Sequence, residues 1–556
     1  SNLGLDARTV QDYEFWSAKT SNRGMGTSYA KNAVDKYTMF TLENMLFYDK
    51  TFNDKHILGV TLLQSIQEDK RESVNVAMEN LPADNLKYYD LGSGLVTNTI
   101  GSSMIKWNMA SFMGRINYNY LGRYLLTVSA RYDGSSRLAD GHKWVLFPSA
   151  ALAWRINEES FMSSTSGWLD NLKLRLGFGK TGNSAVDPYQ TKGTLSLIRY
   201  PFDNGGTPTI GYAPNAMANS LLTWETTDQW NLGIDFGVLR GRINGTIDLY
   251  MQNTHDLLLK RQLPVVSGFP DVLSNVGKTR NKGIEVSINS MNINSKDFQW
   301  TTDLMLSSNK EEIVELYNGK NDDIGSKWFI GQPVNVHYDY RKVGIWQNTE
   351  SDLAEMAKFA ANGTEFAPGD IKIQDVNGDY KITDADKQIL GNPRPKLIAS
   401  MVNTFNYKGF DLSVFLYASF GAMLYNDIYA VEHCGRNGGV KVDYWTPNNP
   451  TNAYPRPSID EERPIYITST YYEKADFLRV KTMTLGYTLP KTLTNKFLVE
   501  KLRVYFTAQN PFIFTNYTGI DPEAAKVNSA GNPETNGSGF GTPSVSSWIF
   551  GINLTL

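Results

Sequence analysis

The segment from Asp375 to Asp386 has the spacing of oxygen ligands that is typical of calcium-binding loops. Such loops supply side-chain oxygens at positions one, three and five, a main-chain carbonyl at seven and a carboxylate at twelve. Those positions are held here by Asp375, Asn377, Asp379, Lys381 (through its carbonyl) and Asp386. The segment departs from the usual pattern at Tyr380, which replaces the turn glycine, and at Asp386, which replaces glutamate. The pattern predicts a structural calcium ion, with an ion-free acidic turn as the alternative.

A second group of candidate residues consists of aromatic side chains outside the regular segments. Aromatic faces stack on sugars and on apolar peptide groups, so such residues can line a ligand surface. The group is Tyr338, Tyr340, Trp346, Tyr444, Trp445 and Tyr454. Packing within loops, or anchoring at a membrane interface, explains each of them equally well. They are predicted ligand-binding residues.

The signs of catalysis are few, and we predict neither catalytic residues nor an organic cofactor. The five histidines have no metal-ligand spacing: His56, His142, His255, His337 and His433. The sequence has no Gly-x-Ser-x-Gly elbow and no phosphate loop, and the glycines at 537, 539 and 541 lack the strand-to-helix setting of a dinucleotide site. A triad assembled from distant strands stays open.

Composition excludes several classes of protein. The 54 Lys and Arg residues nearly balance the 57 Asp and Glu residues, which argues against a nucleic-acid-binding chain. The single cysteine, Cys434, cannot form an internal disulfide or a cysteine-rich metal site. No run approaches about 18 apolar residues, so no transmembrane helix is expected, and residues 1–6 do not resemble a signal peptide. A membrane protein would have to be a closed β-barrel, whose strands alternate in polarity.

Strict alternation of apolar and polar residues is indeed the dominant pattern. Residues 230–238 place apolar side chains at every second position, and residues 243–251 do the same after a short turn at 239–241. The pattern recurs at 112–120 with 124–132, at 396–407 with 410–420, and at 172–178. About fifteen strands are clear, many about ten residues long, which suits tilted strands that cross a bilayer.

Three features favour a membrane barrel over a soluble sandwich, which would also alternate. The strands exceed the usual five or six residues. The turns are tight on one side, whereas long connections such as 184–219 and 421–473 lie on the other. Aromatic residues gather at strand ends, where interfacial belts lie: Tyr118, Tyr120, Tyr124 and Tyr132. We therefore expect the apolar faces to meet lipid, and polar side chains such as Arg115, Asn117, Arg131, Arg175, Arg242, Asp248 and Arg503 to face water.

The last predicted strand has one continuous apolar face, formed by Trp548, Phe550, Ile552, Leu554 and Leu556. A strand of this kind at the chain terminus resembles what outer-membrane barrels present to their assembly machinery. Leu556 departs from the aromatic residue that usually ends them. A terminal core strand of a soluble sheet is the alternative.

Several sequence blocks, in order, resemble the TonB-dependent outer-membrane transporters of the SusC type. The blocks are Leu-Thr-Trp-Glu-Thr-Thr at 222–227, Asn-Leu-Gly-Ile-Asp-Phe at 231–236, Asn-Val-Gly-Lys-Thr-Arg-Asn-Lys-Gly-Ile-Glu at 275–285, Pro-Gly-Asp-Ile-Lys at 368–372, Gly-Asn-Pro-Arg-Pro-Lys at 391–396, Tyr-Lys-Gly-Phe-Asp-Leu at 407–412, Asn-Pro at 510–511 and Tyr-Thr-Gly-Ile-Asp-Pro-Glu at 517–523. The resemblance extends from about Thr38 onward.

The resemblance implies an all-β transmembrane antiparallel barrel of about 22 strands with an N-terminal plug. At roughly 25 to 35 residues for each strand and its loop, the chain supplies about 16 to 20 strands. Residues 1–556 are therefore interpreted as the C-terminal part of the barrel, without the plug, the TonB-contacting segment or the signal peptide. An open sheet edge cannot lie in hydrocarbon, so this part is not expected to stand alone.

The implied function is TonB-dependent import of oligomeric nutrients across the outer membrane of a Gram-negative bacterium. Glycans are the first expectation and peptides the second, and a structural or adhesion barrel that transports nothing is the alternative. The resemblance further implies a SusD-type surface lipoprotein as a lid, energy from the TonB complex through the missing N-terminal region, contact with membrane lipid, and pairing of two transporter–lid units.

Overall fold

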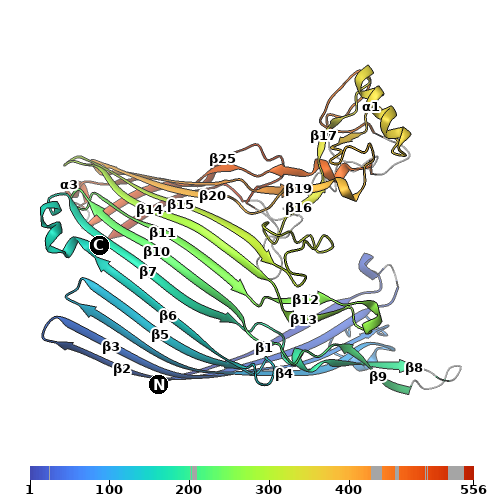
Figure 1. Cartoon of the computed structure of the whole chain (residues 1–556), viewed down its shortest axis with the longest axis horizontal. Coiled ribbons are helices and arrows are strands. Elements are labelled where there is room, and N and C mark those ends of the chain that lie inside the picture. The colour runs from blue at the N-terminus through green and yellow to red at the C-terminus, as the bar shows by residue number, and fades with distance from the viewer. Residues whose placement is uncertain are drawn as a thin grey trace. The chain divides into compact units, whose positions relative to one another are not determined.

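The computed structural model describes residues 1–23, 26–200, 202, 209–426, 441–457, 463–494, 496, 499–523 and 544–555. Sixteen strands form one sheet in the order β1-β2-β3-β4-β5-β6-β7-β10-β11-β14-β15-β20-β21-β24-β25-β26 (Figure 1). Their bounds are β1 (Asn2–Trp16), β2 (Tyr29–Phe52), β3 (His56–Glu79), β4 (Val96–Tyr120), β5 (Tyr124–Ser135), β6 (Trp144–Arg155), β7 (Leu169–Asn183), β10 (Glu225–Val238), β11 (Ile243–His255), β14 (Lys278–Asn294), β15 (Phe298–Glu315), β20 (Leu397–Tyr407), β21 (Phe410–Phe420), β24 (Phe477–Thr488), β25 (Lys501–Thr515) and β26 (Ser547–Thr555).

Contacts divide the chain into two compact units. The first comprises residues 1–155, 175–230 and 252–278, and the second comprises 156–174, 231–251 and 279–556. Within the first unit β1 to β6 pair antiparallel with their sequence neighbours. Within the second, β15, β20, β21, β24, β25 and β26 pair antiparallel in that order, with the short strands of the long connections between some of them in the sequence. The predicted all-β antiparallel architecture is confirmed.

The connections of the sheet alternate between short turns and long excursions, as predicted. The turn between β20 and β21 consists of Lys408 and Gly409, both with positive φ, and that between β10 and β11 contains Gly241 at φ 73°. Left-handed backbone at these positions matches the twist of the flanking strands, which explains the glycines. The long excursions include 184–224, 316–396, 421–476 and 516–546.

The first strands are longer than the sequence suggested. β2, β3 and β4 contain 24, 24 and 25 residues, whereas about ten were expected for many strands. Pairing of β2 with β3 continues without a break from Phe52 opposite His56 to Tyr29 opposite Glu79. We call the half of each strand farther from its tight turn the outer half. Polar residues are mixed with apolar ones there, so the alternation seen near the tight turns fades, although the hydrogen-bonded ladder continues.

Five two-stranded sheets lie within the long connections. They pair β8 (Thr194–Tyr200) with β9 (Thr209–Ala216), β12 (Leu258–Gln262) with β13 (Asp271–Asn275), β16 (His337–Tyr340) with β19 (Lys387–Gly391), β17 (Lys342–Ile345) with β18 (Ile371–Ile373), and β22 (Met423–Tyr425) with β23 (Tyr472–Lys474). The helices described are α1 (Glu350–Ala361) and α3 (Lys491–Thr494), with 3₁₀ turns η1 (Ser21–Arg23), η2 (Leu91–Ser93), η3 (Ile156–Glu158), η4 (Ser160–Thr165), η5 (Gln190–Lys192), η6 (Val265–Ser267), η7 (Asp384–Asp386) and η9 (Ile467–Thr470). Among the residues described, no helix is both long enough and apolar enough to cross a membrane.

The connections from β15 to β20 and from β21 to β24 build a small folded body, which we call the loop domain (residues 337–391, 441–457 and 463–474). Helix α1 begins after Thr349, whose hydroxyl accepts a hydrogen bond from the Asp352 N–H, and lies near β17 (Figure 1). Two apolar clusters form its interior. One contains Ile345, Ile371, Ile373, Trp445, Ile467 and Tyr471, and the other Trp346, Met356 and Phe359.

Candidate functional site

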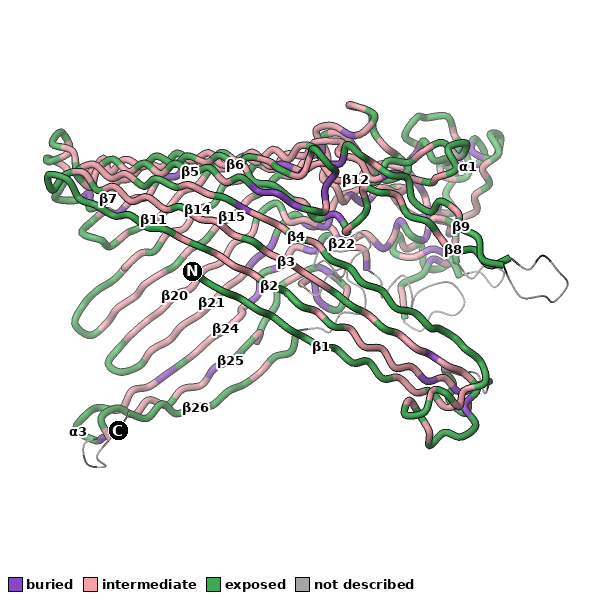
Figure 2. The backbone as a smooth tube through the Cα atoms, turned by 90° about the horizontal axis from the view of Figure 1, so that it is seen from below, coloured by how far each residue is buried: buried purple, intermediate pink, exposed green. Residues whose placement is uncertain are grey.

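The two faces of the sheet differ in polarity, and it is the apolar face that is exposed, the reverse of a soluble protein. In β10, Trp230 and Leu232 are 47% and 40% exposed, whereas Gly233 between Leu232 and Ile234 is buried and Asp235 is half-buried. Exposed and half-buried residues run along the strands of the sheet (Figure 2). We call the side of Trp230 and Leu232 the apolar face and the other side the polar face. Exposed rows of large apolar residues require a non-aqueous surrounding.

Aromatic residues bracket the apolar face of β4, β5 and β6. At the tight-turn end, the rings of Tyr120, Tyr124 and Trp154 stack with centroids 6.2 and 6.4 Å apart. At the other end, Trp144 stacks on Tyr132 at 5.0 Å and on Phe112 at 6.3 Å. Tyr132 follows Tyr124 by eight residues, which is about 27 Å along a strand, or about 20 Å across a bilayer at a tilt of about 40°. This apolar band has the height of a thin hydrocarbon layer.

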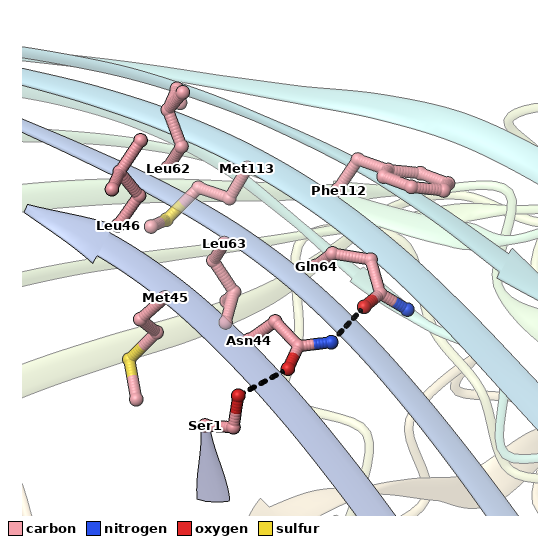
Figure 3. Close-up of a pocket in the computed structure, with 10 residues that line it drawn as sticks. Ser1, Asn44, Met45, Leu46, Leu62, Leu63, Gln64, Phe112 and Met113 are labelled. Atoms are coloured by element: carbon pink, nitrogen blue, oxygen red, sulfur yellow. Dashed lines mark hydrogen bonds between the residues drawn. The ribbon is translucent and has the colours of Figure 1, made fainter.

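Polar groups on the apolar face bond to one another. The Ser1 hydroxyl, just before β1, donates to Asn44 Oδ1 of β2 at 2.7 Å, and the Asn44 amide donates to Gln64 Oε1 of β3 at 2.7 Å (Figure 3). Leu46 and Leu62 lie beside this row in a shallow pocket of about 510 Å³. Mutual hydrogen bonding removes the cost of exposing these polar groups to lipid.

The polar face carries paired charges, within one strand in the first unit and across strands in the second. Arg131 Nε donates to Asp133 Oδ1 at 2.8 Å, and its Nη2 donates to the Ser111 hydroxyl at 2.8 Å. In the second unit, Arg503 Nε donates to Asp411 Oδ1 at 2.9 Å. Paired charges hold long side chains in place and keep the surface wettable, as a path for hydrated solutes requires.

One residue predicted to face water, Arg242, instead bonds to the main chain of a neighbouring strand. Arg242, at the turn before β11, donates to the main-chain oxygens of Met291 and Asn292, at 3.2 and 2.7 Å. Its guanidinium therefore ties the end of β14 to this hairpin.

A buried charge cluster was not anticipated from the sequence. Arg479 of β24 bonds to Asp521 Oδ1 at 2.6 Å and lies 2.7 Å from Glu523 Oε2, while Lys481 donates to Glu523 Oε1 at 2.6 Å. Burial acts to raise the pKa of Asp521, but the N–H groups of Glu523 and Ser544 and the charge of Arg479 outweigh it and hold the pKa below its usual range. The cluster pins the segment after β25 to β24. In the sequence, only the family block at 517–523, which contains Asp521 and Glu523, pointed to this cluster.

Two of the predicted ligand-binding aromatic residues lie in the interior of the loop domain. Trp346 is fully buried against Met356 and Phe359, and Trp445 belongs to the other cluster, where its Nε1 donates to Gln347 Oε1 at 2.8 Å. Both side chains thus pack inside the loop domain, and a ligand role for them stays a prediction. Trp346 packs on the helix that follows it in the sequence, whereas Trp445 contacts Gln347, 98 residues earlier.

The remaining four aromatic residues are less buried. Tyr338 packs on Phe329 with ring centroids 4.8 Å apart, and Tyr340 packs on Tyr466 at 5.0 Å. Tyr444 pairs through its backbone with Tyr454, and its ring is exposed. A ligand role for these residues stays a prediction.

The acidic loop is folded around its own main chain. The two carboxylate oxygens of Asp375 accept hydrogen bonds from the N–H groups of Gly378 and Tyr380, at 2.7 and 2.8 Å. Asp386 is fully buried and accepts from the N–H groups of Val376 and Thr383, at 2.9 and 2.8 Å. Carboxylates held in this way converge on one turn and retain free lone pairs.

Tyr380, at the glycine position, has the left-handed φ of 56° that this turn demands. Its ring packs on Phe359 with centroids 5.5 Å apart, which offsets the strain. Within the residues that the structure describes, no three His, Cys, Asp or Glu side chains gather as a metal site. A calcium ion would therefore depend on Asn377, the Lys381 carbonyl and oxygens from Asp375, Asp379 and Asp386 together, and its presence stays a prediction.

Some predicted features fall outside the described residues, namely His433, Cys434, the glycines at 537, 539 and 541, and Leu556. The described part of β26 keeps the expected apolar row, with Trp548, Phe550, Ile552 and Leu554 exposed. The imidazole of His337 is buried and bonds to the Met423 carbonyl at 2.8 Å, which gives it a structural role.

Comparisons with known proteins agree with this architecture. Residues 1–510 match the family described as TonB dependent receptor-like, beta-barrel. The chain is 32% identical over 531 residues to TonB-dependent receptor P3 of Formosa agariphila, covering 92% of this chain and 52% of that protein. It is 35% identical over 434 residues to TonB-dependent receptor SusC of Bacteroides thetaiotaomicron, covering 75% of this chain and 41% of that protein. The chain thus spans about half the length of the curated relatives it matches.

Solved structures share the fold. The structure of the RagAB peptide transporter matches 99% of this chain and 59% of that chain, with a TM-score of 0.81 and 22% identity. The predicted resemblance is confirmed, and it begins at residue 1 rather than at about Thr38.

Proposed function

The chain belongs to the family of TonB-dependent receptor-like β-barrels, and from this premise we propose that it forms part of the wall of a transporter that imports oligomeric nutrients with energy delivered through TonB. It lies in the outer membrane of a Gram-negative bacterium. The observation that carries the proposal is the opposite chemistry of the two faces of the sheet. Aromatic belts and exposed apolar rows suit lipid, and paired charges suit a wet pore.

We propose glycans as the first substrate class and peptides as the alternative. The chain is 35% identical to the relative named SusC, which supports a function similar to that receptor's. The likeness to a peptide transporter rests on fold alone at 22% identity, so it does not favour peptides. The relatives are receptors and transporters rather than enzymes, which supports import over catalysis.

Three partners belong to the proposal. A SusD-type lipoprotein would cover the long-connection end, where the loop domain offers a folded surface. The TonB complex would act through the N-terminal region that the family resemblance implies. Two transporter–lid pairs would associate. Each follows from the family resemblance, and the lid is tested separately from import.

Growth after deletion of the whole gene tests the import function. Loss of growth on one oligosaccharide, with growth on its monomer retained, is the expected result, and the intact gene should restore it. Loss on a peptide instead selects the alternative substrate. Unchanged growth on every oligomer would favour a structural or adhesion barrel. Deletion of TonB should reproduce the same defect, because the energy comes from the inner membrane.

Co-purification tests the lid. The full-length transporter should retain a surface lipoprotein through its long connections, and exchange of residues 337–391 for a short turn should release it. Retention of the lipoprotein by that variant would contradict a lid held by the loop domain, while leaving import untouched.

A further inference from the structure

A polar pocket of about 480 Å³ lies at the long-connection end of β4, β5 and β6, entirely within the first unit. Its lining comes from the outer half of β4, the 136–143 turn and the segment around η5. It includes Lys106, Asn108, Asp140, Lys143, Tyr189 and Lys192. Neither the family fold nor the proposed import path assigns it a role.

The pocket exists because β4 continues beyond its partner. Pairing of β4 with β5 ends where Met109 faces Ser135, although β4 still pairs with β3 as far as Val96. The free edge is occupied by Tyr189, whose hydroxyl accepts from the Lys106 N–H at 3.1 Å and lies 3.2 Å from the Lys106 carbonyl. This contact anchors η5 and brings Lys192 to the pocket.

The pocket lies directly beyond the aromatic belt. By strand alternation, Phe112, Asn108 and Lys106 share the apolar face of β4. Phe112 belongs to the belt with Tyr132 and Trp144, and Asn108 lies four residues further, about 14 Å along the strand. The face therefore changes from apolar to polar at the level of lipid headgroups.

A second place in the same unit shows the same order. Phe178 and Trp230 pack with ring centroids 4.7 Å apart on the apolar face. Two residues beyond each of them, Lys180 lies 3.8 Å from Asp228, and His255 lies 3.4 Å from the same carboxylate. A charged band thus follows the aromatic belt at both places, and the pocket lies in that band.

The charges of the pocket favour an anion. Three lysines line it against one carboxylate, Asp140, which pairs with Lys143 at 2.5 Å. Lys106 pairs outside the pocket with Glu68 at 2.8 Å. In the described part of the chain, Lys192 makes no ion pair. The Lys143 ammonium first, and Lys192 in addition, hold the pKa of Asp140 below its usual range, so both lysines lie within electrostatic reach of the same point.

We propose that this pocket binds the phosphate of a lipid headgroup in the outer leaflet, with Lys192 and Lys143 as the main contacts and Lys106 as the third. Ammonium groups make short, charge-assisted hydrogen bonds to phosphate oxygens. The half-exposed Tyr189 would border the headgroup. The proposal rests on the membrane placement of the chain, and it holds whether or not the transporter imports glycans.

The test uses the full-length transporter, stripped of lipid in detergent and placed in nanodiscs. Native mass spectrometry measures retention of a phosphorylated lipid A and of the same lipid without phosphate. We expect Lys192→Gln to weaken binding of the phosphorylated lipid about fivefold, and the triple variant with Lys106→Gln and Lys143→Gln to weaken it by more. The control is Lys260→Gln, which removes an exposed lysine paired with Asp271 at 3.8 Å on β12 and should change nothing.

Equal loss of the dephosphorylated lipid, or no loss in the triple variant, would overturn the proposal. Inorganic phosphate and a sulfated oligosaccharide are added as competitors. Displacement of the lipid by either at low concentration would assign the pocket to a soluble anion instead. Unchanged heat-modifiable migration on gels keeps misfolding apart from lost binding. A failed import assay with retained lipid binding would contradict the proposed function alone.

Discussion

The sheet and the loop domain sort the same kinds of side chain in opposite directions. In β26, Phe550 is 81% exposed, and the apolar residues on either side of it are exposed too. In the loop domain, Ile345 is 2% exposed and Ile371 is buried with it. The loop domain follows the rule for proteins in water, where apolar surface is removed from solvent. The sheet obeys the same physics with lipid as its solvent on one side, so its apolar side chains face outward.

The charges repeat the contrast. The sheet keeps Arg131 with Asp133 and Arg503 with Asp411 on its polar face. The loop domain keeps Lys372 at its surface, where the ammonium pairs with Asp352 and Glu355 of α1 and lies 4.0 Å from the centre of the Trp346 ring. The sheet meets water on one face only, whereas the loop domain is surrounded by water. The two regions should therefore respond differently to the same kind of substitution.

The largest difference is expected for Trp346→Ala. The loss of a fully buried tryptophan leaves a cavity between α1 and β18, which costs about 3 to 5 kcal/mol of unfolding free energy. Hydrogen exchange of the β17 and β18 amides should accelerate, whereas the amides of the sheet keep their protection. Tyr444→Ala, at an exposed ring of the same domain, is the control. Equal protection in both variants would mean that the loop domain has no core of its own.

The reverse test places a charge on the apolar face. Val128 lies four residues from both Tyr124 and Tyr132, midway between the belts, and is exposed. Val128→Arg should cost about 2 to 4 kcal/mol in a bilayer, although an exposed valine in water tolerates arginine. The folded fraction in liposomes, read from heat-modifiable gel mobility, measures it.

The neighbouring position on the polar face supplies the control. Thr127→Arg loses one hydrogen bond to Asn117 Oδ1, now 2.9 Å long, and should cost only about 1 kcal/mol. If both arginines fold equally well, the assignment of the two faces is wrong.

The sheet was predictable because its evidence in the chain is local. Alternation fixes which residues share a face, and the Lys408-Gly409 pair fixes a hairpin. The loop domain was not predicted, although Thr349 with Leu353, Met356 and Phe359 after it carries the spacing of a capped amphipathic helix. That signal was readable and was missed.

The site was less predictable than the fold. Trp346 and Trp445 were expected at a ligand surface, but Trp346 packs on Met356 and Phe359, and Trp445 is buried beside segments about a hundred residues away. Arg479 and Asp521 are 42 residues apart, and only the folded chain reveals their pairing. Side-chain position in the long connections depends on such distant contacts, which no local period records.

A change of pH should alter the stability of the loop domain relative to the sheet, by a smaller amount than the substitutions above. Burial lowers the pKa of Lys342 in β17 to about 8, and its ammonium donates to the Ala453 carbonyl at 2.5 Å. Because the folded pKa lies below the unfolded value of about 10.4, the unfolded state binds more protons between these values, so the loop domain gains stability as pH rises through this window. Allowing for partial exposure, we expect a gain of about 2 kcal/mol.

Urea unfolding followed by tryptophan fluorescence at pH 7.5, 9 and 10 measures this gain. Lys342→Met should abolish the dependence while keeping the stem packed. A gain of the same size in that variant would show that another group titrates.

The smallest effect concerns the acidic loop, because removal of calcium should affect the loop domain and not the sheet. Asp375 and Asp386 bring negative charge into a turn that is closed by its own N–H groups, and a bound calcium ion would neutralise that charge. At a calcium concentration ten times the dissociation constant, binding stabilises the folded loop domain by about 1.4 kcal/mol. Chelation should lower the melting temperature of the loop domain and leave the sheet unchanged. Asp375→Ala should abolish the response, whereas Asp384→Ala, at a non-ligand position paired with Lys387 at 2.7 Å, should keep it. Since the carboxylates would repel one another without an ion, insensitivity to both chelation and Asp375→Ala would mean that the N–H groups alone hold the turn, and the metal assignment would fall.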